Sequence, residues 1–225
     1  MGNYKDGRME QISNAGNGNY FYIDSIREAQ KVFVTQLRAT LFTIAGDVKI
    51  QVEFNPVKVK AYRLVGYENR MLADEEFNDD EIDAGELGAG HTVTALYEII
   101  PSGSTRAVKK TDALKYQENK VTAEASITRE IMTIKFRYKS PGEETSKLIK
   151  TSVIDQDFTF REASENFRFS AAVAGFGMLL RASPFSGDLT YQKILTIANN
   201  SKGKDIGGYR TEFISLVETC DLLGG

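Results

Sequence analysis

The chain has 225 residues, of which 41% are hydrophobic and 26% charged, and its 28 basic and 31 acidic side chains give a formal net charge of −3. This composition is typical of a soluble globular protein and excludes the collagen-like, disordered and supercharged classes. No part of the chain is basic enough to predict a nucleic-acid partner.

Neither a membrane span nor a signal peptide is predicted. The uncharged apolar stretch Phe169–Leu180 has 12 residues, whereas a membrane-spanning helix needs about 18 or more. The first twenty residues carry Lys5, Asp6, Arg8 and Glu10 and contain no apolar run. We therefore expect no membrane insertion by this chain.

The first 46 residues predict a helix, a strand and a second helix. A short helix is expected over 5–15, followed by a turn at residues 16–19 and an aromatic strand at 20–23. Asp24 or Ser25 can cap the second helix, whose apolar positions recur at helical spacing until Gly46. Such a unit is typical of the edge of a doubly wound α/β sheet.

The aromatic strand has no pairing partner within this unit. Tyr20, Phe21 and Tyr22 are therefore the candidate apolar interface, because exposed apolar patches mark contact surfaces. An unpaired strand also invites strand addition, so a homodimer through residues 20–23 is one expected partner arrangement.

From Asp47 the hydrophobic period becomes two. Val48, Ile50, Val52 and Phe54 alternate with polar residues, which predicts a half-buried strand that ends at Asn55–Pro56. Further strands are expected at 57–68, 91–100, 131–139 and 146–153, with weaker candidates at 106–110 and 121–128. Five to seven antiparallel strands predict a central β-sandwich over 47–153.

After Asp157 the period is helical again. A largely buried helix is expected from Phe160 to Leu180, followed by helices at about 188–199 and 208–222. The predicted fold class is thus α+β. It has three parts: the helix–strand–helix unit at 1–46, the sandwich at 47–153, and a helical region at 154–225 that packs on the sandwich.

The densest polar feature is a segment with eight carboxylates in the 13 residues from 74 to 86. We interpret it as a solvated loop between strands and as the candidate interaction surface. The alternative is a Ca²⁺-dependent binding module, because Ca²⁺ takes six to eight oxygen ligands. An EF-hand alignment fails at Ala84, where glycine is required. Its carboxylates are Asp74, Glu75, Glu76, Asp79, Asp80, Glu81, Asp83 and Glu86.

If this surface captures a partner, neutralising Asp79, Asp80 and Asp83 should weaken capture and leave the melting temperature nearly unchanged. If instead Ca²⁺ binds there, millimolar Ca²⁺ should raise the melting temperature.

Catalysis has little support in the sequence. His91 is expected at the start of a strand, where a locally bonded histidine is the ordinary outcome, although Asp83 or Glu86 could orient it as an acid–base group. Cys220 falls on the apolar stripe of the last predicted helix and is expected to act as a small hydrophobic residue. No nucleophile, base and orienting group are recognisable together, so we expect no enzyme activity, no catalytic residue and no cofactor.

Five stretches carry a resemblance to a known family. Residues 2–23, with the helix that follows them, resemble the last stretch of a bacterial von Willebrand factor type A domain. The resemblance to the region after that domain in bacterial envelope proteins rests on DVKIQVEFNP (47–56), VGYENR (65–70), FNDDEIDAGELGAGHTVTALYEI (77–99) and GYRTEFISLV (208–217).

The resemblance implies that residues 1–46 are a C-terminal remnant of a type A domain. The metal-binding Asp-x-Ser-x-Ser loop of that family is absent, because Asp24–Ser25 is followed by Ile26–Arg27 and begins a helix. No metal ligand can therefore be assigned. The resemblance also implies a non-catalytic interaction or scaffolding role with an unknown protein partner, in the periplasm or at the surface of a bacterium.

Overall fold

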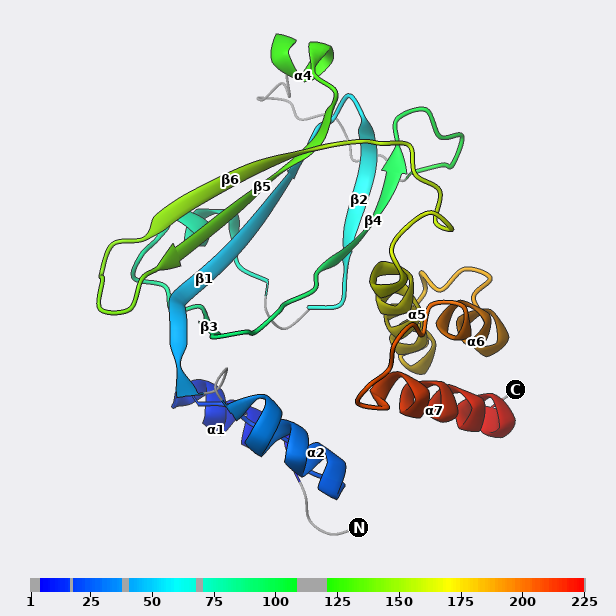
Figure 1. The fold of residues 1–225 in the computed structure, drawn as a ribbon. Coiled ribbons are helices and arrows are strands. Elements are labelled where there is room, and N and C mark those ends of the chain that lie inside the picture. The colour runs from blue at the N-terminus through cyan, green and yellow to red at the C-terminus, as the bar shows by residue number, and fades with distance from the viewer. Residues whose placement is uncertain (1–4, 17, 38–40, 68–70, 109–120, 225) are drawn as a thin grey trace. The chain divides into compact units, whose positions relative to one another are not determined.

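The computed structural model describes residues 5–16, 18–37, 41–67, 71–108 and 121–224, and it contains both helices and antiparallel strands (Figure 1). The α+β fold class is therefore confirmed. The elements are α1 (Asp6–Ala15), α2 (Ile26–Gln30), the π-helix η1 (Lys31–Thr35), β1 (Thr43–Phe54), β2 (Val59–Val65), the 3-10 helix η2 (Asp74–Asn78), β3 (Gly85–Gly88), β4 (Leu96–Pro101), α4 (Ala123–Ile127), β5 (Glu130–Lys139), β6 (Lys147–Ile154), α5 (Glu165–Leu180), α6 (Tyr191–Asn199) and α7 (Tyr209–Gly224).

The strands form two sheets. The larger has four strands in the order β3-β1-β5-β6, and the smaller pairs β2 with β4. β2 and β4 are antiparallel, with Val65 opposite Leu96 and Val59 opposite Pro101. β3 is antiparallel to β1, with Thr43 opposite Gly88 and shifts in register between Thr43 and Ala45 and between Ala45 and Val48.

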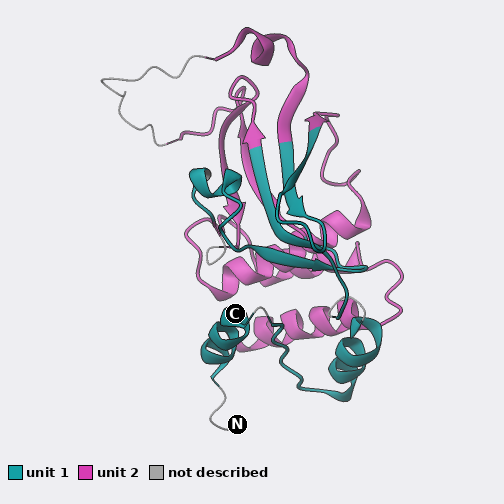
Figure 2. Cartoon of the chain, turned by 90° about the vertical axis from the view of Figure 1, so that its left-hand side faces the viewer, with its two compact units in different colours: residues 1–52, 72–93, 134–151 teal, residues 53–71, 94–133, 152–225 magenta. Residues whose placement is uncertain are grey.

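The chain divides into two compact units, which Figure 2 colours separately. Unit 1 comprises residues 1–52, 72–93 and 134–151, and unit 2 comprises 53–71, 94–133 and 152–225. The division does not follow the chain order, because each unit is assembled from three segments. The boundary predicted between residues 46 and 47 lies inside β1.

The main hydrophobic core lies in unit 2 among α5, α6 and α7. Each of the first two helices begins with a capping hydroxyl: Ser164 accepts a hydrogen bond from the Phe167 N–H, and Thr190 accepts one from the Lys193 N–H, at 3.2 Å each. The core cluster consists of Phe169, Ala172, Phe176, Ile194, Ala198, Ile214 and Val217. No helix among the described residues has the length and apolar character that crossing a membrane requires.

Most predicted elements are present, with small shifts of their ends. The helix predicted over 5–15 is α1, the strands predicted at 57–68, 131–139 and 146–153 are β2, β5 and β6, and the three C-terminal helices are α5, α6 and α7. Ser25 caps α2 by accepting a hydrogen bond from the Glu28 N–H at 3.2 Å.

The N-terminal prediction is wrong at two points. Residues 20–23 are not a strand, and the Tyr20 hydroxyl instead donates to Asp6 at 2.5 Å. The second helix does not reach Gly46, because β1 begins at Thr43. There the backbone pairs with β3, and this long-range pairing outweighs the local helical pattern.

Three strand predictions also differ from the structure. Residues 121–128 contain α4, whose cap is the Thr122 hydroxyl accepting from the Ala125 N–H. β4 begins at Leu96 rather than at residue 91, and residues 106–108 are not in a strand. The rest of the candidate strand at 106–110 lies outside the described residues.

Candidate functional site

The acidic segment, residues 74–86, is not a simple loop. It begins with η2, turns at residues 80–82 and enters β3 at Gly85. Phe77, in the middle of η2, is only 5% exposed. The segment is therefore anchored in unit 1 by a buried aromatic ring, which the high density of carboxylates did not predict.

A buried lysine of β1 fastens the first half of the acidic segment. The Lys49 side chain is 2% exposed. Its Nζ donates hydrogen bonds to the backbone carbonyls of Glu76, at 3.2 Å, and Asp79. A buried charged group must have such acceptors to offset its lost hydration. Lys49 therefore ties η2 to the sheet.

A second lysine, Lys139 of β5, contacts the second half of the acidic segment. Lys139 Nζ lies 2.7 Å from Asp47 Oδ2 and donates to the Asp80 backbone carbonyl at 2.7 Å. Asp47 has φ +48°, a left-handed conformation that aspartate tolerates better than most residues. Its Oδ1 accepts from the Ala84 N–H at 3.1 Å. Lys139 and Asp47 thus bind the backbone of the acidic segment on the two sides of its turn, at Asp80 and at Ala84.

An arginine of β5 contacts the same segment. The Cζ of Arg137 lies 5.5 Å from the centre of the Phe77 ring, and the guanidinium donates to Asn78 Oδ1 at 3.0 Å and to Ser146 Oγ at 2.8 Å. The backbone N–H of Ser146 donates to Asp80 Oδ2 at 3.3 Å. The positive side chains of β1 and β5 therefore compensate part of the acidic charge.

The carboxylates divide into structural and solvent-facing groups. Asp80 is half-buried, and the hydrogen bonds from Ser146, with the charges of Arg137 and Lys139, lower its pKa below the ordinary value. Glu76 accepts from the Ala73 N–H at 2.7 Å. The side chain of Asp74 lies outside the description. The exposed members are Glu75, Asp79, Glu81, Asp83 and Glu86.

Asp80 is therefore unsuitable for the test predicted from the sequence, in which Asp79, Asp80 and Asp83 are neutralised to weaken partner capture. Neutralising it would remove the acceptor of the Ser146 N–H and disturb the attachment of the segment as well as its surface charge. Glu75 and Glu81 are exposed and are the better positions at which to neutralise surface charge.

Acidification should loosen this attachment. Burial raises the pKa of Asp47, but the hydrogen bonds from Lys139 and the Ala84 N–H outweigh it and hold the pKa below the ordinary 3.8. The Asp47 contribution to stability is therefore present above the pKa of the unfolded chain and is lost as pH falls through the lower folded value. The protection factors of residues 72–93 against hydrogen exchange, which are corrected for the slower intrinsic exchange in acid, should fall below about pH 4.

The contribution of Glu86 to stability changes with pH in the direction opposite to that of Asp47. Although the side chain is exposed overall, partial desolvation of its carboxyl group and the nearby charges of Asp47 and Asp83 raise the pKa of Glu86 above 4.5. Its protonation on acidification therefore offsets part of the stability that is lost at Asp47. The Asp47→Asn variant should have lower protection factors than the wild type at pH 7, and these factors should depend less on pH below 4. Glu75→Gln is the exposed control. Equal acid dependence in the wild type and Asp47→Asn would contradict the assignment.

Metal binding gains no support from this arrangement. Across residues 5–16, 18–37, 41–67, 71–108 and 121–224, no group of three or more histidine, cysteine, aspartate or glutamate side chains is placed to hold a metal ion. The Ca²⁺ alternative stays a prediction.

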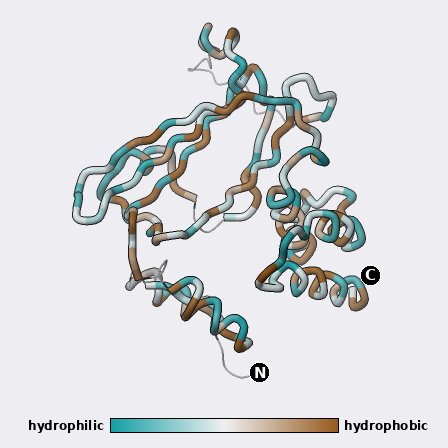
Figure 3. The backbone as a smooth tube through the Cα atoms, viewed as in Figure 1, coloured by the Kyte–Doolittle hydropathy of each residue, from teal (hydrophilic) through white to brown (hydrophobic). Residues whose placement is uncertain are grey.

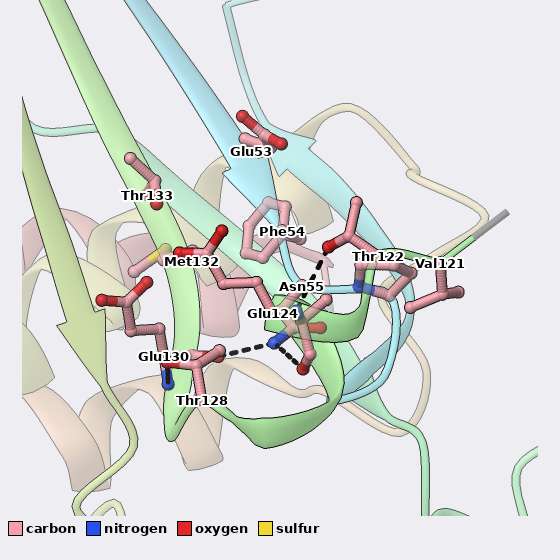
Figure 4. A pocket seen from close by; sticks show the side chains of 12 residues that line it. Glu53, Phe54, Asn55, Val121, Thr122, Glu124, Thr128, Glu130, Met132 and Thr133 are labelled. Carbon is pink, nitrogen blue, oxygen red and sulfur yellow. Dashed lines mark hydrogen bonds between the residues drawn. The ribbon is translucent and has the colours of Figure 1, made fainter.

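Unit 2 contains a cavity of about 350 Å³ next to α4 (Figure 4). Glu53, Glu124 and Glu130 give it an acidic lining. The Asn55 amide donates to the carbonyls of Ala125, at 2.9 Å, and Glu130, at 3.0 Å.

The other polar groups at this cavity are also used by the fold. Asn55 Oδ1 accepts from the Val57 N–H at 2.9 Å. The Thr122 and Thr128 hydroxyls accept from backbone N–H groups at 3.2 Å each. Asn55 and the two threonines therefore hold the turn after β1 and the ends of α4 in place.

The remaining candidate residues lie apart in sequence and setting. Phe21 and Tyr22 are exposed, whereas Tyr20 is half-buried. His91 is exposed in the turn after β3, where its N–H donates to the Gly88 carbonyl at 3.0 Å. Cys220 is half-buried and packs against the helical core, as expected from its place on the apolar stripe.

Sequence reasoning missed the residues that fasten the acidic segment. Lys49 and Lys139 occupy polar positions of alternating strands, so the pattern directs them to solvent. The one available signal was charge: an acidic segment of this density needs basic neighbours wherever part of it is buried.

Comparisons with known proteins identify one family. Residues 39–223 match the family model described as "Uncharacterized protein YfbK, C-terminal". The chain is 42% identical over 219 residues to the uncharacterized protein YfbK of Escherichia coli (strain K12). The aligned region covers 97% of this chain and 37% of the E. coli protein. No solved structure matches.

Proposed function

Because the chain belongs to the family of the YfbK C-terminal region, we propose that it is a non-catalytic protein-interaction or scaffolding region of a YfbK-like protein. The chain spans 37% of the length of the curated relative that it matches. The activity and partners of a whole YfbK-like protein are therefore part of this proposal.

One observation carries the proposal: the segment that begins with α2 exposes a run of large apolar side chains. Phe33 is 59% exposed and Val34 69% exposed, whereas the preceding residue, Val32, is buried. Figure 3 shows hydrophobic stretches along this segment. The other exposed members are Ile26, Leu37 and Leu41. Exposed apolar groups gathered in this way are typical of a surface that another chain or domain covers.

The partner that we propose for this surface is the remainder of a von Willebrand factor type A domain. The support is the resemblance of residues 2–23 and the following helix to the end of such a domain. In a longer YfbK-like protein the apolar side chains from Ile26 to Leu41 would then be buried against it. The same resemblance leads us to propose a location in the periplasm or at the cell surface of a bacterium.

The acidic segment is proposed as a second contact. Its exposed carboxylates, with Glu75 and Glu81 at the solvent side, would favour a basic partner surface and speed association more than they strengthen it. Such a contact weakens with added salt, because exposed charges are screened.

The test is a binding titration between this chain and the part of E. coli YfbK that the chain does not cover, produced separately. Phe33→Glu should weaken binding at least about tenfold, because a charge would be buried in an apolar contact. Its melting temperature should stay near the wild-type value, since Phe33 is exposed. Phe158→Glu, at a residue that is 70% exposed, is the matched control and should bind like the wild type.

The outcome separates the two contacts. If binding is abolished by Phe33→Glu but unchanged by salt, the apolar surface acts and the acidic segment does not. Equal binding by Phe33→Glu and Phe158→Glu, or no binding by the wild type, would show that the proposed surface is wrong.

A further inference from the structure

We propose that β6 pairs with β6 of a second copy of this chain, antiparallel and about a two-fold axis. β6 is an edge strand of the four-stranded sheet. Of its eight residues only Val153 is half-buried, and the others are exposed. An edge strand presents backbone N–H and C=O groups that another strand can pair with. The inference does not depend on the proposed function.

The sequence of β6 selects one register. Opposite residues of an antiparallel pair point to the same face, so in a symmetric pair one residue must lie opposite its own copy. With Thr151 at that position, the threonine hydroxyls face each other. The apolar residues then pair with apolar residues: Ile149 lies opposite Val153, and Leu148 lies opposite Ile154. Cross-strand pairs of these types are favourable.

The charged residues at the ends of β6 are also complementary in the register that places Thr151 opposite itself. Lys147 comes to lie opposite Asp155 of the second copy, at both ends of the paired strands, and Lys150 lies opposite Ser152. Within the chain, Lys147 pairs with Glu143 at 2.7 Å on the surface. An exposed pair of this kind contributes little to stability, so the lysine can exchange it for the aspartate of the second copy.

Neighbouring registers are less favourable. Placing Lys150 opposite itself sets like charges against each other, which destabilises a strand pair. Placing Ser152 opposite itself puts Ile149 opposite Asp155 and Lys150 opposite Ile154. The complementarity of the Thr151 register for its own copy is the reason to name a second copy as the partner rather than a different protein.

The register predicts a particular pattern for charge substitutions at Thr151. Thr151→Lys should weaken the dimer at least about fivefold, because two lysines then lie opposite each other. Thr151→Glu should do the same with two carboxylates. An equimolar mixture of the two variants should restore association, since lysine then faces glutamate. The residue is exposed, so neither change should unfold the chain.

The measurement is the weight-average mass of the full chain by sedimentation equilibrium over a concentration series. Strand pairing buries less area than a permanent dimer, so a weak, concentration-dependent dimer is expected. Thr145→Lys, at an exposed threonine in the turn before β6, is the matched control and should associate like the wild type. Circular dichroism establishes that each variant is folded.

Each outcome decides the question. Association weakened at least about fivefold in both Thr151 variants, with recovery in the mixture, supports the pairing. A wild type that stays monomeric up to about 1 mM overturns it. So does a dimer that tolerates Thr151→Lys, or a mixture that remains monomeric, since either would place the contact elsewhere or in another register.

Discussion

Ile194→Ala is expected to lower the free energy of unfolding of the C-terminal helices by about 2–5 kcal/mol. Ile194 lies in α6 and is fully buried. It belongs to the core cluster shared by α5, α6 and α7. Removing its outer carbon atoms takes apolar surface out of contact and leaves a cavity that packed helices fill only in part.

The measurement is the free energy of unfolding from urea or thermal denaturation. Hydrogen exchange resolved to residues 165–180, 191–199 and 209–224 assigns the change to the three helices. Ile206→Ala is the control, because Ile206 is 98% exposed and its truncation should change stability by less than about 0.5 kcal/mol. A loss below about 1 kcal/mol for Ile194→Ala would mean that α6 is not held by this core.

The helical core was predictable because its signal is local. The apolar residues of α5 and α7 recur at helical spacing, and hydroxyl groups at Ser164 and Thr190 mark where α5 and α6 begin. The strands β1, β5 and β6 follow from alternation in the same way. Each of these patterns is contained in a few consecutive residues.

The wrong predictions concern elements that form by pairing between segments distant in the sequence. The helical pattern of the sequence continues to Ile44, but its neighbours Thr43 and Ala45 pair with β3 more than 40 residues later. β3 itself, Gly85–Gly88, is four residues long and lies in the acidic segment, so neither its length nor its composition indicated a strand. Tertiary contacts outweigh local preference at these positions.

The face of β1 also departs from its pattern near the acidic segment. Alternation directs Ile50 to the interior and Lys49 to solvent, yet Ile50 is exposed and Lys49 is buried. The acidic segment covers the polar face at this point and supplies carbonyl acceptors for the lysine. A sequence pattern cannot predict which segment covers a strand, so this part of the site had to come from the structure.

Lys49→Ala should lower the free energy of unfolding of unit 1 by about 3 kcal/mol. The substitution removes the buried aliphatic stem and leaves the carbonyls of Glu76 and Asp79 without their donor. Hydrogen exchange of residues 72–93 reports the change. Lys150→Ala, at an exposed lysine of β6, should behave like the wild type when measured at low concentration.

Lys49→Met separates the two causes. Methionine keeps most of the apolar stem but cannot donate a hydrogen bond, and it also removes the cost of burying a charge. We therefore expect Lys49→Met to lose less than half as much stability as Lys49→Ala. A loss as large as that of the alanine variant would mean that the hydrogen bonds to η2 outweigh the packing of the stem. No loss in Lys49→Ala would mean that Phe77 and Lys139 hold the acidic segment without Lys49, and that the burial of this charge contributes nothing to the attachment.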